Sequence, residues 1–281
     1  MKIQSVPVKH LMVKSSLPAS DYVINPYIGC THRCRYCYAC FMKRFTNHKE
    51  EWGTFVDVKE GPRLKIPKNI SQKTILISSV TDPYQPIEKT YGSTRAILEQ
   101  LKDTTGKIEI LTKSHLVTRD MDLFLQFSQI RIGISMNTLD DSFRKDMEPG
   151  ASSIPQRLEA LRQLSKHGLS TYLFLSPIFP EITDIRSLVH ETAPYVEEIC
   201  FENLNLRGAQ VSQILSYIGK KYPEYLPLYH EIYRKHRMTY WEEMKEMIQE
   251  LNQSYPVTFT NYFYHEKIKK KGNNEDEYTI S

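Results

Sequence analysis

The sequence predicts an α/β fold, a partial (β/α)6 barrel of the TIM type, and two observations carry this prediction. Short apolar, β-branched runs bounded by turn residues recur along the chain, as over residues 74–79, and such runs are typical of buried parallel strands. Stretches with helical spacing of apolar residues alternate with them, which indicates a parallel sheet covered by helices. The runs number six or seven, fewer than a closed eight-stranded barrel needs.

The expected elements follow one another in a regular order. Expected strands cover residues 21–25, 74–79, 107–112, 130–136, 170–175, 198–201 and 257–259. After a helix that opens near Tyr38, expected helices cover residues 94–101, 119–127, 154–167, 185–195, about 209–222 and about 239–253. The 154–167 helix is the clearest, because its apolar residues recur at helical spacing and Gly168 follows as a C-cap.

One large domain with two extensions is expected. Residues 1–20, which contain Pro7 and Pro18, predict an irregular N-terminal arm. Residues 21–262 predict the barrel with its C-terminal helices, and the charged residues 263–281 predict a flexible tail. With 281 residues, 40% of them hydrophobic, the chain can bury a substantial core.

Three of the five cysteines lie within eight residues. Cys30, Cys34 and Cys37 form a C-x3-C-x2-C pattern in the run NPYIGCTHRCRYCY. A [4Fe–4S] cluster is normally held by four thiolates, so three would leave one iron open for another molecule. Two closed sites remain as alternatives: a structural zinc site completed by Cys40 or His32, and a four-cysteine cluster for simple electron transfer.

The other cysteines and the apolar pattern bear on the compartment. Cys40 and Cys200 are too few for a disulfide-stapled scaffold, and clustered cysteines are typical of metal ligands. We find no secretory h-region at the N-terminus and no apolar run of transmembrane length. We therefore expect a reducing, cytoplasmic compartment and no membrane partner.

Charge is distributed unevenly along the chain. The net charge is +4, but residues 1–70 carry 12 Lys and Arg against 5 Asp and Glu. This excess around the cysteines favours an anionic substrate or partner, including nucleic acid. The alternative is that these cations offset the negative charge of three thiolates. The composition is far from that of a dedicated nucleic-acid-binding module, which would be strongly basic.

The cysteine run resembles the cluster loop of the radical S-adenosylmethionine enzymes. In that superfamily the open iron binds the amino and carboxylate groups of S-adenosylmethionine, and electron transfer into the sulfonium yields a 5′-deoxyadenosyl radical. The resemblance implies a [4Fe–4S] cluster on Cys30, Cys34 and Cys37, S-adenosylmethionine as cofactor, and a low-potential electron donor of the flavodoxin or ferredoxin type. Tyr36 resembles the ring that forms a wall for the adenine, and ordinary packing is its alternative.

The segment after the second main strand extends the resemblance, because chemistry in such barrels lies at the carboxyl ends of strands. Its sequence, SSVTDPYQPIE, resembles the spore photoproduct lyase-like branch of the superfamily. Most relatives have a small-residue and acidic motif here that binds an amino group. Ser79, Thr81 and Asp82 are the matching cofactor-binding groups, with a proline-rich turn and a helix-capping Asp as the alternative.

The next two strand ends add further matching groups. Lys113 follows the third strand, where a lysine suits the carboxylate of S-adenosylmethionine. Ser135 and Asn137 lie two residues apart on the fourth strand, so both can point at one ligand, and the lyase-like branch has a similar Ser-x-Asn here. The Glu-Pro-Gly segment at Glu148 and the following Arg157 also match that branch. We expect these two residues to form a structural ion pair.

The match to the lyase itself fails at one position. That enzyme returns a hydrogen atom to its DNA product from a cysteine, where this chain has Ser79, and a serine hydroxyl is a poor hydrogen-atom donor. Cys200 is the candidate replacement, although a buried cysteine commonly only packs. Tyr36 and Tyr38 match a tyrosine pair near the radical path and are the other catalytic candidates. The short chain resembles small members encoded beside a second radical S-adenosylmethionine enzyme, which would be a partner.

Two functions from different classes follow. The first is an enzyme that cleaves S-adenosylmethionine reductively and abstracts hydrogen from a substrate, with nucleic acid as the leading expectation and a peptide as the alternative. The second is an iron–sulfur electron-transfer or regulatory protein, or a zinc-stabilised binding module, without turnover. Glu202, Asn203 and Asn205 follow the sixth strand and are expected on the substrate side of the barrel mouth.

Overall fold

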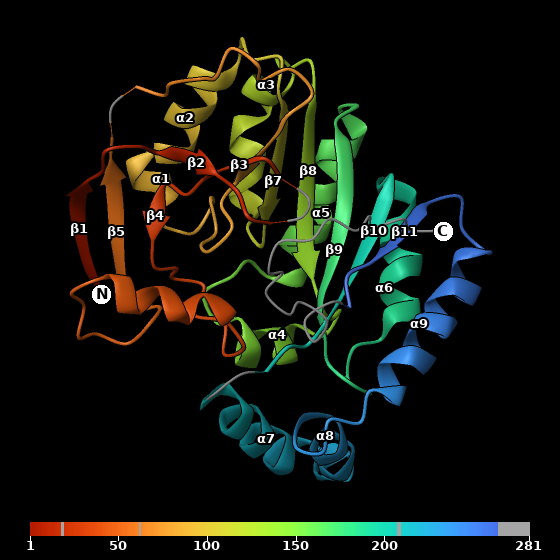
Figure 1. The fold of residues 1–281 in the computed structure, drawn as a ribbon. Helices are drawn as coiled ribbons and strands as arrows, with labels where there is room; N and C mark the ends of the chain where they lie inside the picture. The colour runs from red at the N-terminus through yellow and green to blue at the C-terminus, as the bar shows by residue number, and fades with distance from the viewer. Residues whose placement is uncertain (18–19, 62, 207–208, 264–281) are drawn as a thin grey trace, which may run out of the picture.

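An eight-stranded sheet forms the centre of the protein (Figure 1). The structure is a computed structural model that describes residues 1–17, 20–61, 63–206 and 209–263, so the expected tail lies outside the described residues except for Phe263. The strands of the sheet, in chain order, are β2 (Met12–Lys14), β3 (Tyr22–Ile24), β6 (Thr74–Ile77), β7 (Lys107–Thr112), β8 (Ile130–Met136), β9 (Ser170–Ile178), β10 (Glu198–Asn203) and β11 (Thr258–Asn261).

The strand order confirms the predicted partial barrel. The sheet runs β11-β10-β9-β8-β7-β6-β3-β2, and every neighbouring pair except β3–β2 is parallel. β2 pairs antiparallel with β3 at one edge, and β11 forms the other edge, so the wall stays open. Because all parallel strands end at the same edge, the loops that follow them meet at one mouth.

Most of the helices cover the outer face of the sheet (Figure 1). The α-helices are α1 (Glu88–Tyr91), α2 (Ser93–Leu101), α3 (Met121–Phe124), α4 (Asp141–Met147), α5 (Ile154–Lys166), α6 (Ile185–Thr192), α7 (Ala209–Lys221), α8 (Leu226–Tyr233) and α9 (Thr239–Asn252). The 3₁₀ helices are η1 (Tyr38–Phe45), η2 (His115–Asp120), η3 (Ala193–Tyr195) and η4 (Pro223–Tyr225). Among the described helices, none combines the length and the apolar character that a membrane crossing requires.

The core lies between the sheet and these helices. Alternate residues of β8, such as Ile132 and Ile134, are fully buried in the same apolar cluster as Leu161 and Leu164 of α5. Ser153 and Gln156 form a capping box that fixes the start of α5, the second helix after β8. The remaining residues of β8 face the barrel interior, where the polar groups gather.

The predicted irregular arm over residues 1–20 is wrong. β1 (Lys2–Pro7) pairs in parallel with β5 (Phe55–Glu60), β4 (Tyr27–Ile28) joins β5 antiparallel, and β2 extends the main sheet. β1 exposes nearly all its side chains, so it lacks the apolar alternation that would announce a strand. Its hydrogen bonds to β5, which lies about fifty residues away in sequence, define it instead.

Candidate cofactor site

The cysteine loop is packed tightly against other backbone segments. Gly29 has a φ of 90°, and a Cβ there would lie 2.3 Å from the carbonyl oxygen of Phe55. A Cβ on Gly150 would lie 2.0 Å from the carbonyl oxygen of Thr31. Only glycine permits these approaches, so the start of the loop is held at two points by contacts that a side chain would break.

Two side chains from the loop after β6 hold the cysteine loop in place. The Thr81 hydroxyl donates to the Gly29 carbonyl oxygen at 2.7 Å. The Gln85 amide donates to the same oxygen at 3.2 Å and accepts from the Thr31 backbone N–H at 2.9 Å. Thr81, predicted as a cofactor ligand, therefore supports the loop in this structure. The sequence did not single out Gln85, because a polar amide inside a turn segment indicates no particular role.

Asp82 connects the loop to the ends of two strands. Its carboxylate accepts from the Thr112 hydroxyl at 2.6 Å and from the Lys113 backbone N–H at 2.7 Å, and lies 3.3 Å from His32 Nδ1. Burial favours a higher pKa for Asp82, but the neighbouring His32 and these hydrogen bonds lower the pKa overall. Ser79 lies close by, where its backbone N–H donates to Asn25 Oδ1 at 2.8 Å. Cofactor binding by Asp82 and Ser79 stays a prediction.

Of the three clustered cysteines, Cys30 is buried, and Cys34 and Cys37 are partly exposed. Burial, followed by the charges of Asp82 and Cys37, raises the pKa of Cys30 to about 12. Burial also raises the pKa of Cys34 and Cys37, and Cys30 and Cys37 both affect the pKa of Cys34. Burial therefore disfavours the thiolate forms, which need a positively charged group to stabilise them.

The donor set fits a polynuclear cluster better than a single ion. In the part of the chain that the structure describes, no group of three or more His, Cys, Asp or Glu side chains is placed to hold one metal ion. In an iron–sulfur cluster each thiolate binds a separate iron, so the sulfurs need not converge on one point. Cys40 is exposed, with its Sγ 3.8 Å from Gln210 Nε2, which counts against it as the fourth ligand of a closed site. His32 is buried, with Nδ1 3.3 Å from Asp82 and Nε2 without a hydrogen-bond partner, as in many metal-ligating histidines, so a site completed by His32 stays an alternative.

A buried charged group lies beside the cysteines. Glu148 and Arg157 are both fully buried and form the expected ion pair. Lys113 Nζ lies 3.6 Å from Glu148 Oε1, and the Tyr36 hydroxyl donates to the same carboxylate. Burial opposes ionisation, but Arg157 and Lys113 hold the pKa of Glu148 at about 2. Sequence reasoning found the pair and missed that Lys113 and Tyr36 join it.

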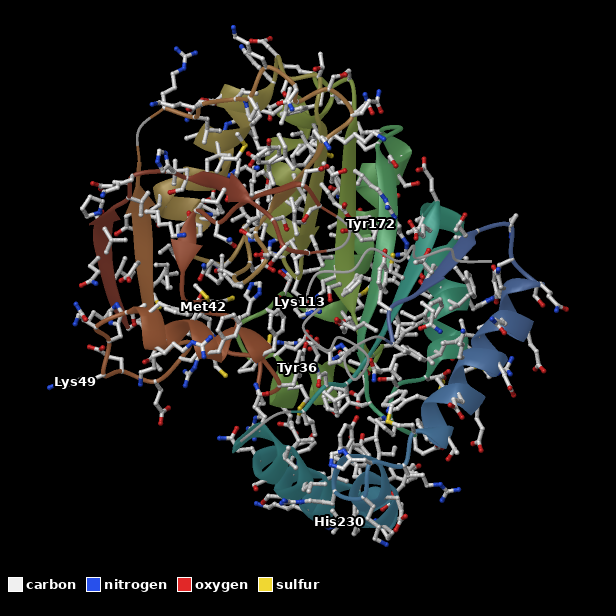
Figure 2. The ribbon with its side chains drawn as sticks, in the orientation of Figure 1. Tyr36, Met42, Lys49, Lys113, Tyr172 and His230 are labelled. Carbon is white, nitrogen blue, oxygen red and sulfur yellow. The ribbon has the colours of Figure 1, made fainter. Side chains whose placement is uncertain are left out.

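The predicted residues of the third and fourth strand ends meet. Lys113 Nζ donates to Ser135 Oγ and lies 5.9 Å from the centre of the Tyr36 ring. Figure 2 shows Lys113 and Tyr36 together at the strand ends, with Tyr172 further back along the sheet. Lys113 also lowers the pKa of Cys34, against burial and the charge of Glu148, so this cation lies within electrostatic reach of the cysteine loop.

Three asparagines at the ends of strands have buried amide atoms without partners. Asn137 follows β8 and is fully buried, and neither its Nδ2 nor its Oδ1 has a hydrogen-bond partner. Asn203 Oδ1 at the end of β10 and both amide atoms of Asn261 at the end of β11 are also unpartnered. Each such group costs about 1–3 kcal/mol when it lacks a partner. A polar ligand in the mouth would supply these bonds, as an amino-acid cofactor can.

The three catalytic candidates occupy different surroundings. Tyr36 is half-buried, and the centre of its ring lies 5.7 Å from that of Phe179 in an edge-to-face arrangement. Tyr38 is exposed, and its hydroxyl donates to the Ser79 carbonyl oxygen. Cys200 is buried inside the barrel, where burial and then the charge of Glu198 raise its pKa. The structure brings Tyr36 into the Lys113 group and leaves a catalytic part for Cys200 a prediction.

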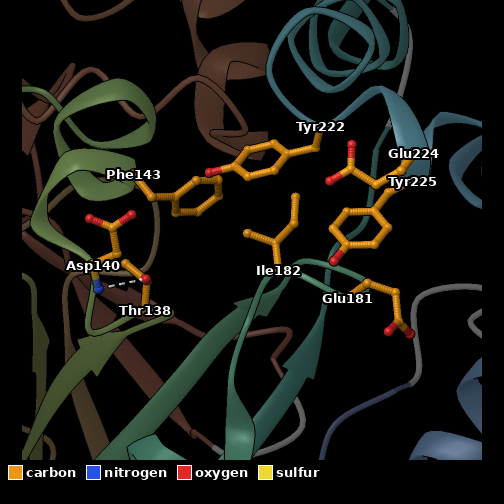
Figure 3. A pocket seen from close by; sticks show the side chains of 8 residues that line it. All are labelled: Thr138, Asp140, Phe143, Glu181, Ile182, Tyr222, Glu224 and Tyr225. Atoms are coloured by element: carbon orange, nitrogen blue, oxygen red, sulfur yellow. Dashed lines mark hydrogen bonds between the residues drawn. The ribbon is translucent and has the colours of Figure 1, made fainter.

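A pocket of about 290 Å³ opens beyond the ends of β8 and β9 (Figure 3). Aromatic rings and carboxylates line it together, and no Lys or Arg is among its lining residues: Thr138, Asp140, Phe143, Glu181, Ile182, Tyr222, Glu224 and Tyr225. Figure 3 shows the rings of Phe143, Tyr222 and Tyr225 around Ile182. The walls come from the strand-end loops on one side and from the α7–α8 region on the other.

Comparison with known proteins identifies relatives of this chain. The model of the "Radical SAM superfamily" matches residues 24–189. An uncharacterised protein of Methanocaldococcus jannaschii is 41% identical over 225 residues, which cover 80% of this chain and 85% of that protein. The spore photoproduct lyase of Bacillus subtilis is 28% identical over 175 residues, 61% of this chain and 49% of the lyase.

Solved structures show the same fold. A spore photoproduct lyase complexed with a dinucleoside spore photoproduct superposes with a TM-score of 0.57 at 19% identity, covering 79% of this chain and 66% of that one. Streptococcus suis SuiB bound to its precursor peptide SuiA gives a TM-score of 0.53 at 13% identity, covering 86% of this chain and 48% of SuiB. The family match covers more than half of the chain and contains the cysteine loop, Lys113 and Asn137, and by it this protein belongs to the radical SAM superfamily.

Proposed function

We propose that the protein is a radical SAM enzyme that holds a [4Fe–4S] cluster on Cys30, Cys34 and Cys37 and binds S-adenosylmethionine in the barrel mouth. Reductive cleavage of S-adenosylmethionine at such a cluster supplies a 5′-deoxyadenosyl radical that abstracts hydrogen from a substrate. The observation that carries the proposal is the unpartnered Asn137 amide, which lies one strand from Lys113 at the same edge as the cysteine loop.

Different residues of the mouth are suited to different parts of S-adenosylmethionine. Lys113 is suited to the carboxylate of S-adenosylmethionine, because its ammonium group already lies among hydrogen-bond acceptors at the strand ends. The Glu148–Arg157 ion pair fixes the positions of Lys113 and Tyr36, because both contact the Glu148 carboxylate. Ser135 and Asn137 offer hydroxyl and amide groups to the polar part of the ligand, while Tyr36 offers a ring face for its adenine.

Two substrate classes have separate support. Nucleic acid is the first, because the fold is similar to that of a spore photoproduct lyase solved with a dinucleoside photoproduct. A peptide is the second, because the carboxylate-lined pocket beside the mouth would repel phosphate groups and attract a cationic side chain. SuiB, which shares the fold, has been solved with a precursor peptide. A second radical SAM protein as partner remains part of the proposal.

The test is anaerobic reconstitution with iron and sulfide, reduction with dithionite, and EPR with and without S-adenosylmethionine. We expect a reduced-cluster signal that changes when S-adenosylmethionine is added, together with formation of 5′-deoxyadenosine. A signal that ignores S-adenosylmethionine would favour an electron-transfer protein instead, and zinc without a cluster signal would favour a binding module. Cys40→Ala is the matched control for Cys34→Ala: the first should keep the cluster and the second should lose it.

Substrate class is tested in the same assay. Single-stranded and duplex oligonucleotides and basic and acidic peptides would each be added, and the rate of 5′-deoxyadenosine formation compared with the substrate-free rate. Stimulation by oligonucleotides alone would support the first class, and stimulation by basic but not acidic peptides the second. Transfer of deuterium from labelled substrate into 5′-deoxyadenosine would identify the hydrogen that is abstracted.

A further inference from the structure

The helix that follows the cysteine loop exposes an unusual group of aromatic rings. Tyr38, Phe41 and Phe45, all on η1, are 56%, 41% and 66% exposed. Elsewhere among the described residues, the large hydrophobic side chains that face water are mostly aliphatic and scattered along the chain. Single exposed apolar residues are ordinary, but several on one short element are typical of an interaction site.

Positive charge accompanies these rings. Lys43 and Arg44 form the last turn of η1, and η1 contains no acidic residue. The Arg44 guanidinium lies 5.3 Å from the centre of the Phe41 ring and 4.7 Å from that of Phe45. In the described part of the chain neither cation takes part in an ion pair, and Lys43 Nζ donates only to the Lys49 carbonyl oxygen. We call Tyr38, Phe41, Lys43, Arg44 and Phe45 the η1 surface.

The η1 surface adjoins the place where an electron must arrive. η1 begins at the residue after Cys37, so its backbone continues directly from the last cysteine of the loop. Figure 2 shows Met42 of η1 on the same side of the molecule as Tyr36, which lies between Cys34 and Cys37. Cys37, one of the three proposed cluster ligands, is therefore the N-cap residue of the helix that carries the η1 surface.

We propose that the η1 surface is the docking site for an acidic electron-donor protein. This inference rests on the proposed function, because only a reductive enzyme needs such a donor. A donor with carboxylates around an exposed redox centre would pair with Lys43 and Arg44, while its apolar centre would cover Phe41 and Phe45. Opposite charges on the two faces raise the rate of encounter and set the orientation in which the electron passes.

Single-stranded nucleic acid is the other partner that aromatic and basic residues can bind. Two observations favour the protein donor. Arg44 already lies over both phenylalanine rings, which leaves less free face for stacked bases while its N–H groups remain available for carboxylates. The nearby pocket with Asp140, Glu181 and Glu224 would repel a phosphate backbone that continued across the mouth.

The experiment compares a charge reversal on the η1 surface with a matched reversal elsewhere. Lys43→Glu/Arg44→Glu is the test variant, and Lys102→Glu/Lys166→Glu, at two exposed lysines on the outer helices, is the control. Formation of 5′-deoxyadenosine would be measured with a reduced bacterial flavodoxin and, separately, with dithionite. With flavodoxin we expect kcat/KM for the donor to fall about tenfold in the test variant, because steering by charge is lost. With dithionite the rate should be unchanged, and the control should match the wild type in both assays.

Three results would overturn the inference. They are an equal fall with both reductants, an unchanged rate with flavodoxin, and a loss of affinity for single-stranded oligonucleotide in the test variant without loss of flavodoxin binding. Failure of the proposed function looks different, because the wild-type protein would then form no 5′-deoxyadenosine even with dithionite. Flavodoxin binding, followed by fluorescence anisotropy at low and high salt, measures docking independently of turnover, and 0.3 M salt should weaken it in the wild type more than in the test variant.

Discussion

Both ends of the barrel interior contain polar side chains. Those at the amino-terminal end pair with one another, whereas several at the mouth have atoms without a hydrogen-bond partner. At the amino-terminal end, Arg131 pairs with Glu198, and the Thr260 hydroxyl donates to the same carboxylate. The Arg131 guanidinium also lies 4.1 Å from the centre of the Tyr172 ring. At the mouth, Asn137 and Asn203 have buried amide atoms with no partner at all.

This difference separates structure from function within one sheet. Polar groups that satisfy one another stabilise the fold and offer nothing to a ligand. Unpartnered amides lower the stability of the ligand-free protein, and a fold retains them where a bound molecule completes their hydrogen bonds. The contrast predicts that partnered and unpartnered residues respond oppositely to substitution: the first should change stability, the second ligand affinity.

The largest effect is expected at the partnered charges below the mouth. Glu148→Gln would leave Arg157 buried without a counter-charge, and we expect the free energy of unfolding to fall by about 3–5 kcal/mol. Urea denaturation measures this. Glu191→Gln is the matched control, because its partner Arg162 is also an arginine but the pair is substantially exposed, and it should cost less than about 1 kcal/mol. Equal losses of unfolding free energy in the two variants would mean that the buried Glu148 pair stabilises the fold no more than an exposed pair does.

Acid should reveal the same carboxylate without any substitution. The pKa of Glu148 is about 2 in the folded protein, below its ordinary value, so its ionised form stabilises the fold above pH 5. That contribution, about 3 kcal/mol, should be lost as the pH falls from about 5 to 2. The unfolding free energy of Glu148→Gln should depend less on pH across this range than that of the wild type. Parallel curves for the two proteins would contradict the assignment.

A smaller effect on stability is expected at the amino-terminal end of the barrel interior. A Cβ on Gly133 would lie 2.2 Å from Cζ of Tyr172, so Gly133→Ala must displace a ring packed under Arg131. We expect a loss of about 1–3 kcal/mol with S-adenosylmethionine affinity unchanged. Gly219→Ala, where the nearest atom is the flexible end of Leu226, should be tolerated. A large change in cofactor affinity for Gly133→Ala would mean that the two ends are coupled.

Asn137→Ala is expected to have the smallest effect on stability and the clearest effect on ligand affinity. Because its amide lacks partners, stability should stay within about 0.5 kcal/mol of the wild type or rise. Affinity for S-adenosylmethionine, measured by calorimetry on the reconstituted protein, should fall about tenfold, or about 1.4 kcal/mol. Asn25→Ala should behave in the opposite way, because Asn25 Oδ1 accepts from the backbone N–H groups of Ser79 and Val80.

The sequence located the parallel strands of the main sheet and missed β1, β2, β4 and β5. β7 and β8 begin and end where expected, because isoleucines recur at alternate positions in both strands. β1 was missed because its side chains face water, and α4 because its polar sequence buries only one face, through Phe143 and Met147. The expected 119–127 helix begins earlier, as η2 and α3. In such elements, tertiary partners decide the structure.

The candidate site was predictable where one residue type implies one chemistry. Cysteine spacing indicated the cluster, and a lysine at a strand end indicated an anion site that now has Ser135 beside it. The supporting contacts were not predictable, because they join segments that local pattern does not relate. Gln85 and Gly150 contact the cysteine loop only once three strand ends have come together. The unpartnered amides likewise become apparent only when burial is known.

The attachment of the cysteine loop has a consequence for how the protein matures. The shape of the loop depends on the Thr81–Gln85 turn and on Gly150, which follow it in the chain and are therefore synthesised later. Until those segments fold, the three thiols have no fixed spacing. Iron and sulfide delivered to a nascent chain would therefore meet a disordered ligand, and the cluster can be inserted correctly only after the segment that contains Gly150 has been synthesised and folded.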